Sequence, residues 1–101
     1  MRKIINGRLY DTDTASKVGE YSYGYVGNFN YFCEALYCKR TGEYFIYGVG
    51  GAMSKYAESC GQNQWQGGSS IIPIGQDYAR IWAENHLDAD EYVAEFGMPE
   101  E

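Results

Sequence analysis

The sequence is poor in the residues that metal centres require. It contains one histidine, His86, and three cysteines, Cys33, Cys38 and Cys60. Structural zinc sites are usually built from closely spaced pairs of such ligands. Cys33 and Cys38 lie five positions apart and would point to opposite faces of one strand. We therefore expect them to be small buried side chains, and the sequence predicts no metal site.

The lack of a second histidine also argues against nucleophilic catalysis. Ser54, Ser59 and Cys60 are candidate nucleophiles, but His86 is the only imidazole that could serve as their base. The Gly-x-Ser-x-Gly turn of hydrolases is missing. His86 falls near the end of a predicted helix, where a capping role is common. We expect a protein that is not an enzyme and has no catalytic residues.

The sequence also gives only weak evidence for a cofactor motif or for a functional pair of carboxylates. Residues 48–54 form a glycine-rich run, as in phosphate-binding turns, but position 53 is Met where the dinucleotide pattern has Gly. Asp11 and Asp13 have the spacing of the first two ligands of a calcium-binding loop. The later positions that such a loop needs as Gly and Glu are both Ser in this sequence. Glu34 and Glu43 could face each other across a hairpin, which is ordinary on a sheet surface. The sequence predicts no cofactor.

Long hydrophobic runs are absent too. No stretch approaches the roughly 20 apolar residues of a membrane span. The apolar run near the start, Ile4-Ile5, ends after two residues and does not match a secretion signal. An odd number of cysteines is typical of reduced thiols. We expect a cytoplasmic protein that does not bind membranes.

What the chain does contain is tyrosine and glycine. Its 101 residues include eleven tyrosines and thirteen glycines, with 45% hydrophobic and 22% charged residues. This size and composition indicate one folded domain, residues 1–101, with much sheet. The tyrosines could complete a small core, form a protein interface or contact a small ligand.

Negative charge is concentrated in the last quarter. Residues 1–76 carry seven Lys/Arg and six Asp/Glu, whereas residues 77–101 carry eight acidic residues against Arg80 alone, a balance of −7. Such a surface repels phosphate backbones, so direct binding of nucleic acid is not expected. Two interpretations stay open: a solvated helix face, or a surface that attracts the basic groove of another protein.

Two hairpins are predicted from turn chemistry. Asn6-Gly7 lies between short β-type runs, and both central positions of such a turn need positive φ. Residues 31–39 and 43–47 predict a second hairpin, with Gly42 at the left-handed position of its turn. In the first of these strands Phe32, Glu34, Leu36 and Cys38 share one face.

For the segments beside these hairpins, the sequence predicts structure that is less regular. Residues 15–19 fit either one helical turn or an extended link. Residues 48–51 should break the second hairpin's returning strand because they contain three glycines. Residues 52–59 predict a short helix, and residues 62–70 predict a polar loop with Trp65 at its centre.

The last third predicts an edge strand and a helix. Pro73 lacks a ladder donor, so residues 71–74 should form an edge strand. Residues 76–86 predict a helix with Tyr78, Ile81 and Trp82 on its inward stripe.

A second helix should follow and complete the fold. Asp88 and Glu91 have the spacing of a capping box, and the helix should end at Gly97. Its inward residues should be Tyr92, Val93 and Phe96. The expected class is α+β, an antiparallel sheet of hairpins with two C-terminal helices packed on it.

Several segments together resemble a known group of proteins. These are residues 3–15 (KIINGRLYDTDTA), residues 42–56 (GEYFIYGVGGAMSKY), the Ile-Ile-Pro-Ile segment at 71–74 and the helix that carries Trp82. In this order they resemble small proteins of phages and conjugative elements of Gram-positive gut bacteria, over residues 3 to 96. The resemblance implies an accessory protein of a mobile element and assigns no functional residues. Some small acidic proteins of that setting are anti-CRISPR inhibitors that occupy the nucleic-acid grooves of effector nucleases.

The leading prediction is an acidic, non-enzymatic binding protein of this anti-defence kind. Its partner would be a host defence protein, a CRISPR effector nuclease, blocked by direct protein contact. Acidic residues of the last helix would mimic phosphates, and tyrosines would supply contact area. The expected partner-binding residues are Asp88, Asp90, Glu91, Glu95, Tyr21, Tyr23 and Tyr25.

Two alternatives stay open at this level. A small-ligand or glycan-binding module could use Trp65 with Gln64 and Gln66, because aromatic rings beside amides suit sugars. A homodimer could instead bury the tyrosine faces.

Overall fold

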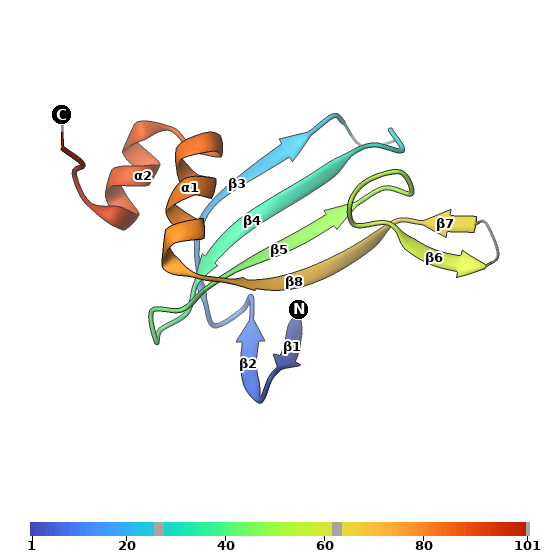
Figure 1. Ribbon diagram of the computed structural model, residues 1–101, viewed down its shortest axis with the longest axis horizontal. Helices are drawn as coiled ribbons and strands as arrows, with labels where there is room; N and C mark the ends of the chain where they lie inside the picture. The colour runs from blue at the N-terminus through green and yellow to red at the C-terminus, as the bar shows by residue number, and fades with distance from the viewer. Residues whose placement is uncertain (26–27, 62–63, 101) are drawn as a thin grey trace.

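The computed structural model describes residues 1–25, 28–61 and 64–100 (Figure 1). The predicted α+β class is confirmed, with antiparallel sheets followed by two C-terminal helices that pack on the main sheet. In Figure 1 the helices cover one end of this sheet, and a small hairpin extends from the opposite end. The molecule is elongated, 49 × 32 × 20 Å.

The main sheet is four-stranded and antiparallel, in the order β3-β4-β5-β8. Strands β3 and β8 therefore form its two edges, and the edge position predicted for residues 71–74 is confirmed. The four strands are β3 (Ser16–Tyr23), β4 (Phe32–Cys38), β5 (Tyr44–Gly50) and β8 (Gly68–Ile74).

Both predicted hairpins are confirmed. Strands β1 (Arg2–Ile5) and β2 (Arg8–Asp11) are joined by Asn6 and Gly7, whose φ angles of 53° and 77° are the positive values this turn requires. Gly42, with φ of 90°, closes the turn between β4 and β5. Of residues 15–19, which fitted either a helical turn or an extended link, residues 16–19 are extended, since β3 begins at Ser16.

The glycine run of residues 48–51 does not break β5, contrary to prediction. Gly48 stays in register between Glu34 of β4 and Ser70 of β8. A side chain at Gly48 would collide with the ring of Tyr56, which lies directly over it. The glycine is needed for the close approach of this ring, and the neighbouring strands keep the segment extended. The same register leaves Glu43 before the start of β5, so Glu34 and Glu43 do not face each other.

The helix predicted for residues 52–59 is wrong as well. Residues 52–56 form turns because their backbone bonds to the loop before β4: Gly51 N donates to Tyr31 O, and Met53 N donates to Phe29 O. The chain then forms a hairpin, β6 (Glu58–Gly61) and β7 (Gln64–Gln66), and β7 lies in the segment predicted to be a polar loop. Residues 62 and 63 of that loop lie outside the described residues.

Helix α1 (Gln76–His86) has the predicted bounds but a different inward stripe. Ala79, Trp82 and Ala83 are buried, whereas Tyr78 and Ile81 are more than half exposed. Two alanines let the helix axis lie close to the sheet, so the helix turns its small side chains inward. The predicted stripe was right for Trp82 alone.

Helix α2 (Ala89–Phe96) confirms the predicted capping box. The Asp88 carboxylate accepts a hydrogen bond from Glu91 N at 2.8 Å, and the Glu91 carboxylate accepts one from Asp88 N. The helix ends at Gly97, which has φ of 87°. The predicted inward residues Tyr92, Val93 and Phe96 are half-buried, and Phe96 packs against the core.

The main sheet has a core on each face. On the helix side the core is Leu36, Tyr44, Ile46, Ala79 and Trp82. On the other side, which the β1–β2 hairpin covers, it is Tyr10, Phe45 and Ile71. Some tyrosines therefore do complete the core, as one of the interpretations held. Among the described residues, neither helix has the length and apolar character needed to cross a membrane.

Candidate protein-binding surface

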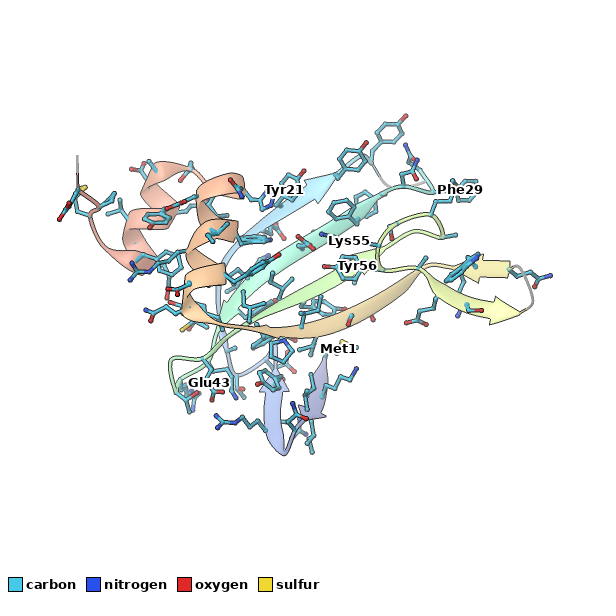
Figure 2. All side chains as sticks on the ribbon, in the orientation of Figure 1. Met1, Tyr21, Phe29, Glu43, Lys55 and Tyr56 are labelled. Atoms are coloured by element: carbon cyan, nitrogen blue, oxygen red, sulfur yellow. The ribbon has the colours of Figure 1, made fainter. Side chains whose placement is uncertain are left out.

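The helix-side face of the sheet continues beyond the helices as an open surface. Along β3 and β4, the residues that share this face are Tyr21, Tyr23, Phe32 and Glu34, because Tyr21 is paired with Glu34 and Tyr23 with Phe32. In Figure 2, Tyr21 lies near the end of α1, and Lys55 and Tyr56 lie over the middle of the sheet. This surface contains Glu34, the one buried glutamate among the residues that the structure describes, and a row of aromatic rings.

The buried glutamate is Glu34, which is 5% exposed. Its carboxylate accepts hydrogen bonds from the Tyr56 hydroxyl and from Trp82 Nε1, the latter at 3.0 Å. Lys55 Nζ lies 2.7 Å from the same carboxylate. The four residues form a cluster, here called the Glu34 cluster, that joins β4, the 51–57 segment and α1.

Electrostatics keep Glu34 ionised. Burial alone would raise its pKa, but hydrogen bonds from Lys55, Tyr56 and Trp82 outweigh burial and hold the pKa below the ordinary value of 4.5. Burial and the adjacent carboxylate raise the pKa of Tyr56, so its hydroxyl remains a donor. A carboxylate saturated by three donors is a poor general base. The cluster is suited to anchoring the 51–57 segment on the sheet.

Lys55 also contacts two rings. Its ammonium lies 4.8 Å from the centroid of Phe32 and 5.7 Å from that of Tyr56. The side chain of Lys55 is 56% exposed, so the cluster reaches solvent on the Lys55 side. Phe32 is thereby fixed between the Glu34 cluster and the tyrosines of β3.

The aromatic strip consists of His86, Tyr21, Phe32 and Tyr23. Tyr21 stacks on His86 with ring centroids 4.0 Å apart, and Tyr23 stacks on Phe32 at 5.5 Å. Tyr21 and Phe32 meet edge-on at 6.1 Å. Tyr23 is 54% exposed. These contacts make a preordered aromatic surface that begins at α1 and runs along β3.

His86 was predicted to cap α1, but its ring lies on Tyr21 and edge-on to Trp82. The cap hydrogen bond comes instead from Leu87 N to Ala83 O. Burial lowers the pKa of His86, so the imidazole is neutral at physiological pH and stacks as a flat apolar ring.

Of the three tyrosines predicted to bind a partner, two lie together. Tyr21 and Tyr23 share the helix-side face of the sheet. Tyr25 lies beyond the end of β3, after Gly24, whose φ of 76° turns the chain. Tyr25 is 74% exposed but does not continue the alternation of the strand.

The predicted acidic residues lie on the helix layer, and three of them also have structural contacts. Asp88 and Glu91 form the capping box. Glu95 accepts a hydrogen bond from the Tyr44 hydroxyl at 2.6 Å and is half-buried. Asp90 is exposed. Their charges remain at the surface, but Asp88, Glu91 and Glu95 are not freely placed phosphate mimics.

The residues of the alternative ligand site do not converge. In β7, Trp65 is 61% exposed, and the alternation of a strand places it on the opposite face from Gln64 and Gln66. A sugar stacked on the indole would therefore not reach these two amides.

Two of the three cysteines are described as thiols that burial makes less reactive. Cys33 and Cys38 are free and lie on opposite faces of β4, as predicted. Burial raises the pKa of both thiols. The side chain of Cys60 lies outside the description. Within residues 1–25, 28–61 and 64–100, no group of three or more His, Cys, Asp or Glu comes together as a metal site.

Sequence reasoning placed Glu34 on the same face as Phe32 and Leu36 but missed the Glu34 cluster. The available signal was a glutamate on the apolar face of an alternating strand, because a buried carboxylate needs hydrogen-bond donors around it.

Comparisons with protein families, with curated proteins and with solved structures find no match for this chain.

Proposed function

We propose that this protein binds another protein without catalysing a reaction, and that its partner is a host defence nuclease of the CRISPR effector kind. The observation that carries the proposal is the half-buried aromatic strip, with Tyr23 exposed at its end, beside a helix layer of strongly negative charge. The resemblance to accessory proteins of mobile elements supports the choice of partner. On this proposal the protein acts in the cytoplasm, where such nucleases act.

The aromatic strip has the chemistry of a binding hot spot. Tyrosine supplies large contact area at a low cost in conformational entropy and is enriched at the centres of interfaces. Tyr21 and Tyr23 are already stacked, and Phe32 is fixed by the Glu34 cluster. Little ordering is left to occur on binding, which favours affinity.

The acidic helix layer selects the kind of partner. With eight acidic residues against one arginine, residues 77–101 attract a basic surface and repel nucleic acid. A nuclease groove that binds phosphates is basic, so the same field would bring this protein to the place where nucleic acid binds. Occupying that groove would inhibit the nuclease by competition.

A pull-down tests the proposal. Tagged protein is incubated with lysate of a CRISPR-bearing host, with and without nuclease treatment, and bound proteins are identified by mass spectrometry. We expect an effector nuclease that survives nuclease treatment. Tyr23→Ser should reduce its capture about tenfold or more, since the most exposed ring of the strip is lost. Trp65→Ser, which removes an equally exposed ring from the far hairpin, should not.

Two outcomes would count against the proposal. An empty pull-down contradicts it for that host, and equal loss of capture in Tyr23→Ser and Trp65→Ser would move binding away from the strip. A thermal shift of several degrees with a sugar, abolished by Trp65→Ser, would favour the ligand-binding alternative instead.

A further inference from the structure

A groove lies between the two helices, outside the aromatic strip. Its volume is about 320 Å³, and it runs from the end of α1 across the connecting residues to α2. The apolar lining includes Leu87, Tyr92 and Val93, and the acidic residues of the lining are Glu84 and Asp88. Both acidic residues are exposed.

The groove is held in shape by contacts on several sides. The Leu87 side chain packs so closely over Gly19 of β3 that a methyl group at Gly19 would collide with it. The capping box fixes Asp88 at the start of α2. The ring of Tyr92 lies against that of Phe96, with centroids 5.1 Å apart. The groove is therefore preformed rather than opened by a ligand.

Its charge is unbalanced. Among the residues that the structure describes, no lysine or arginine lines it. Arg80, the one basic residue of residues 77–101, lies over the ring of Phe96 at 5.6 Å and is not part of the lining. The two carboxylates therefore give the groove a negative charge, and the Asp88 carboxylate also accepts the capping hydrogen bond from Glu91 N.

We infer that this groove binds a short segment of the partner protein in which large apolar side chains are flanked by lysine or arginine. The inference deepens the proposed function and rests on it for the identity of the partner. A volume of about 320 Å³ is at the lower end for ligand pockets, which suits one or two apolar side chains rather than a whole helix. Glu84 and Asp88 would pair with the flanking cations.

Three synthetic peptides test the chemistry directly. Lys-Lys-Leu-Leu-Lys-Lys carries both features, Lys-Lys-Gly-Gly-Lys-Lys carries only charge, and Glu-Glu-Leu-Leu-Glu-Glu carries the wrong charge. Each is titrated into the ¹⁵N-labelled protein, and amide shifts are followed by NMR. We expect only the first to saturate in the submillimolar range, with shifts centred on the amides of Leu87, Tyr92 and Val93.

Two variants and a matched control locate the site. Ala89→Phe fills the groove without changing charge, and Glu84→Lys reverses one charge of its lining; each should weaken the first peptide about tenfold or more. Asp13→Lys makes the same change in net charge at an exposed position outside the groove and should have little effect. Asp88 is left intact because it caps α2.

Equal binding of the glycine peptide, shifts outside the groove, or wild-type affinity in Ala89→Phe would overturn the inference. Its failure is distinguishable from failure of the proposed function. If an effector nuclease is captured equally well by Ala89→Phe and wild type, the groove is not used although the proposed function holds. If the first peptide binds in the groove and no nuclease is captured, the groove chemistry holds and the proposed partner is wrong.

Discussion

Glu34 is the residue whose environment most constrains this molecule. A carboxylate that is 5% exposed is costly unless every lone pair facing the protein is satisfied. Here the Tyr56 hydroxyl, Trp82 Nε1 and the Lys55 ammonium satisfy it, and none of these three residues belongs to β4. The same contacts that compensate burial therefore fix the position of α1 and of the 51–57 segment.

Glu34→Gln should destabilise the fold. The amide keeps the shape and one oxygen, but its NH₂ group faces donors that were bonded to a carboxylate. We expect a loss of about 1–3 kcal/mol in the free energy of unfolding, measured by urea denaturation. Glu20→Gln on β3 is the control, since its exposed pair with Lys17 is worth at most about 1 kcal/mol. Equal effects of the two changes would contradict the anchoring role.

The contribution of Glu34 should depend on pH in a defined direction. Its pKa in the folded protein lies below the ordinary value of 4.5, so the unfolded chain binds the proton more tightly. The stabilisation is complete above pH 4.5 and is lost as pH falls through the folded pKa. The difference in stability between wild type and Glu34→Gln should therefore shrink in acid. A difference that stays constant down to pH 3 would contradict the lowered pKa.

Gly48→Ala should be strongly destabilising, because a methyl group there collides with the Tyr56 ring. Displacing the ring also breaks its hydrogen bond to Glu34. We expect a loss of about 1–3 kcal/mol, measured by thermal or urea unfolding. In a Tyr56→Ala background the same change should cost far less, since the space is empty. Additive costs in the double variant would show that the collision is not the cause.

At the scale of elements, α2 is short and depends on its cap. Asp88→Ala removes the hydrogen bond to Glu91 N and should cost about 0.5–2 kcal/mol in the free energy of unfolding. Asp90→Ala removes the same charge from the first turn of the helix without touching the cap, and it should cost less. Chemical denaturation of the two variants side by side measures the difference. Equal costs would mean that charge alone stabilises the helix start.

The edges of the main sheet are protected against pairing with another strand. β3 has a bulge between Lys17 and Gly19, and Lys17 forms an exposed ion pair with Glu20 across it. β8 contains Pro73, which has no N–H to donate. Lysine, proline and bulges at an edge all oppose strand addition. The sheet therefore offers its faces, rather than its edges, for binding.

The elements that could be predicted are those set by local chemistry. Asn6-Gly7 and Gly42 determine hairpin turns through positive φ, and the Asp88–Glu91 spacing determines a helix start. Residues 48–59 could not be predicted because distant partners decide their conformation. Tyr56 lies over Gly48, and the backbone of Gly51 bonds to the loop before β4, neither of which leaves a local pattern. Gly48 would weaken an isolated strand, but β5 needs a glycine at this position because the ring of Tyr56 lies over it.

At the scale of the whole molecule, the negatively charged surface and the aromatic surface lie one after the other along the same side. The acidic helices cover one end of the sheet, and the aromatic strip begins at His86 and runs away from them along β3 (Figures 1 and 2). The charge imbalance was readable from composition, because it depends only on residue counts. The contact between His86 and Tyr21 could not be predicted from the sequence, since these residues lie 65 positions apart.

This charge layout predicts that association with the captured nuclease is sensitive to salt. Raising ionic strength from 50 to about 500 mM shortens the Debye length severalfold and should slow association about tenfold or more. Stopped-flow or surface-based kinetics give the association rate directly. Glu84→Lys and Asp90→Lys together should reduce both the rate and its salt dependence. A rate unaffected by salt would exclude steering by the helix layer.

The most direct test is competition for the nuclease groove. The captured effector nuclease is purified and incubated with fluorescent target nucleic acid, this protein is titrated in, and release is followed by anisotropy. Stoichiometric release by wild type and by Trp65→Ser, but not by Tyr23→Ser, is the result expected if the strip and the acidic helices block the groove. Simultaneous binding of the nucleic acid and this protein, with no loss of nuclease activity, would contradict the proposed function.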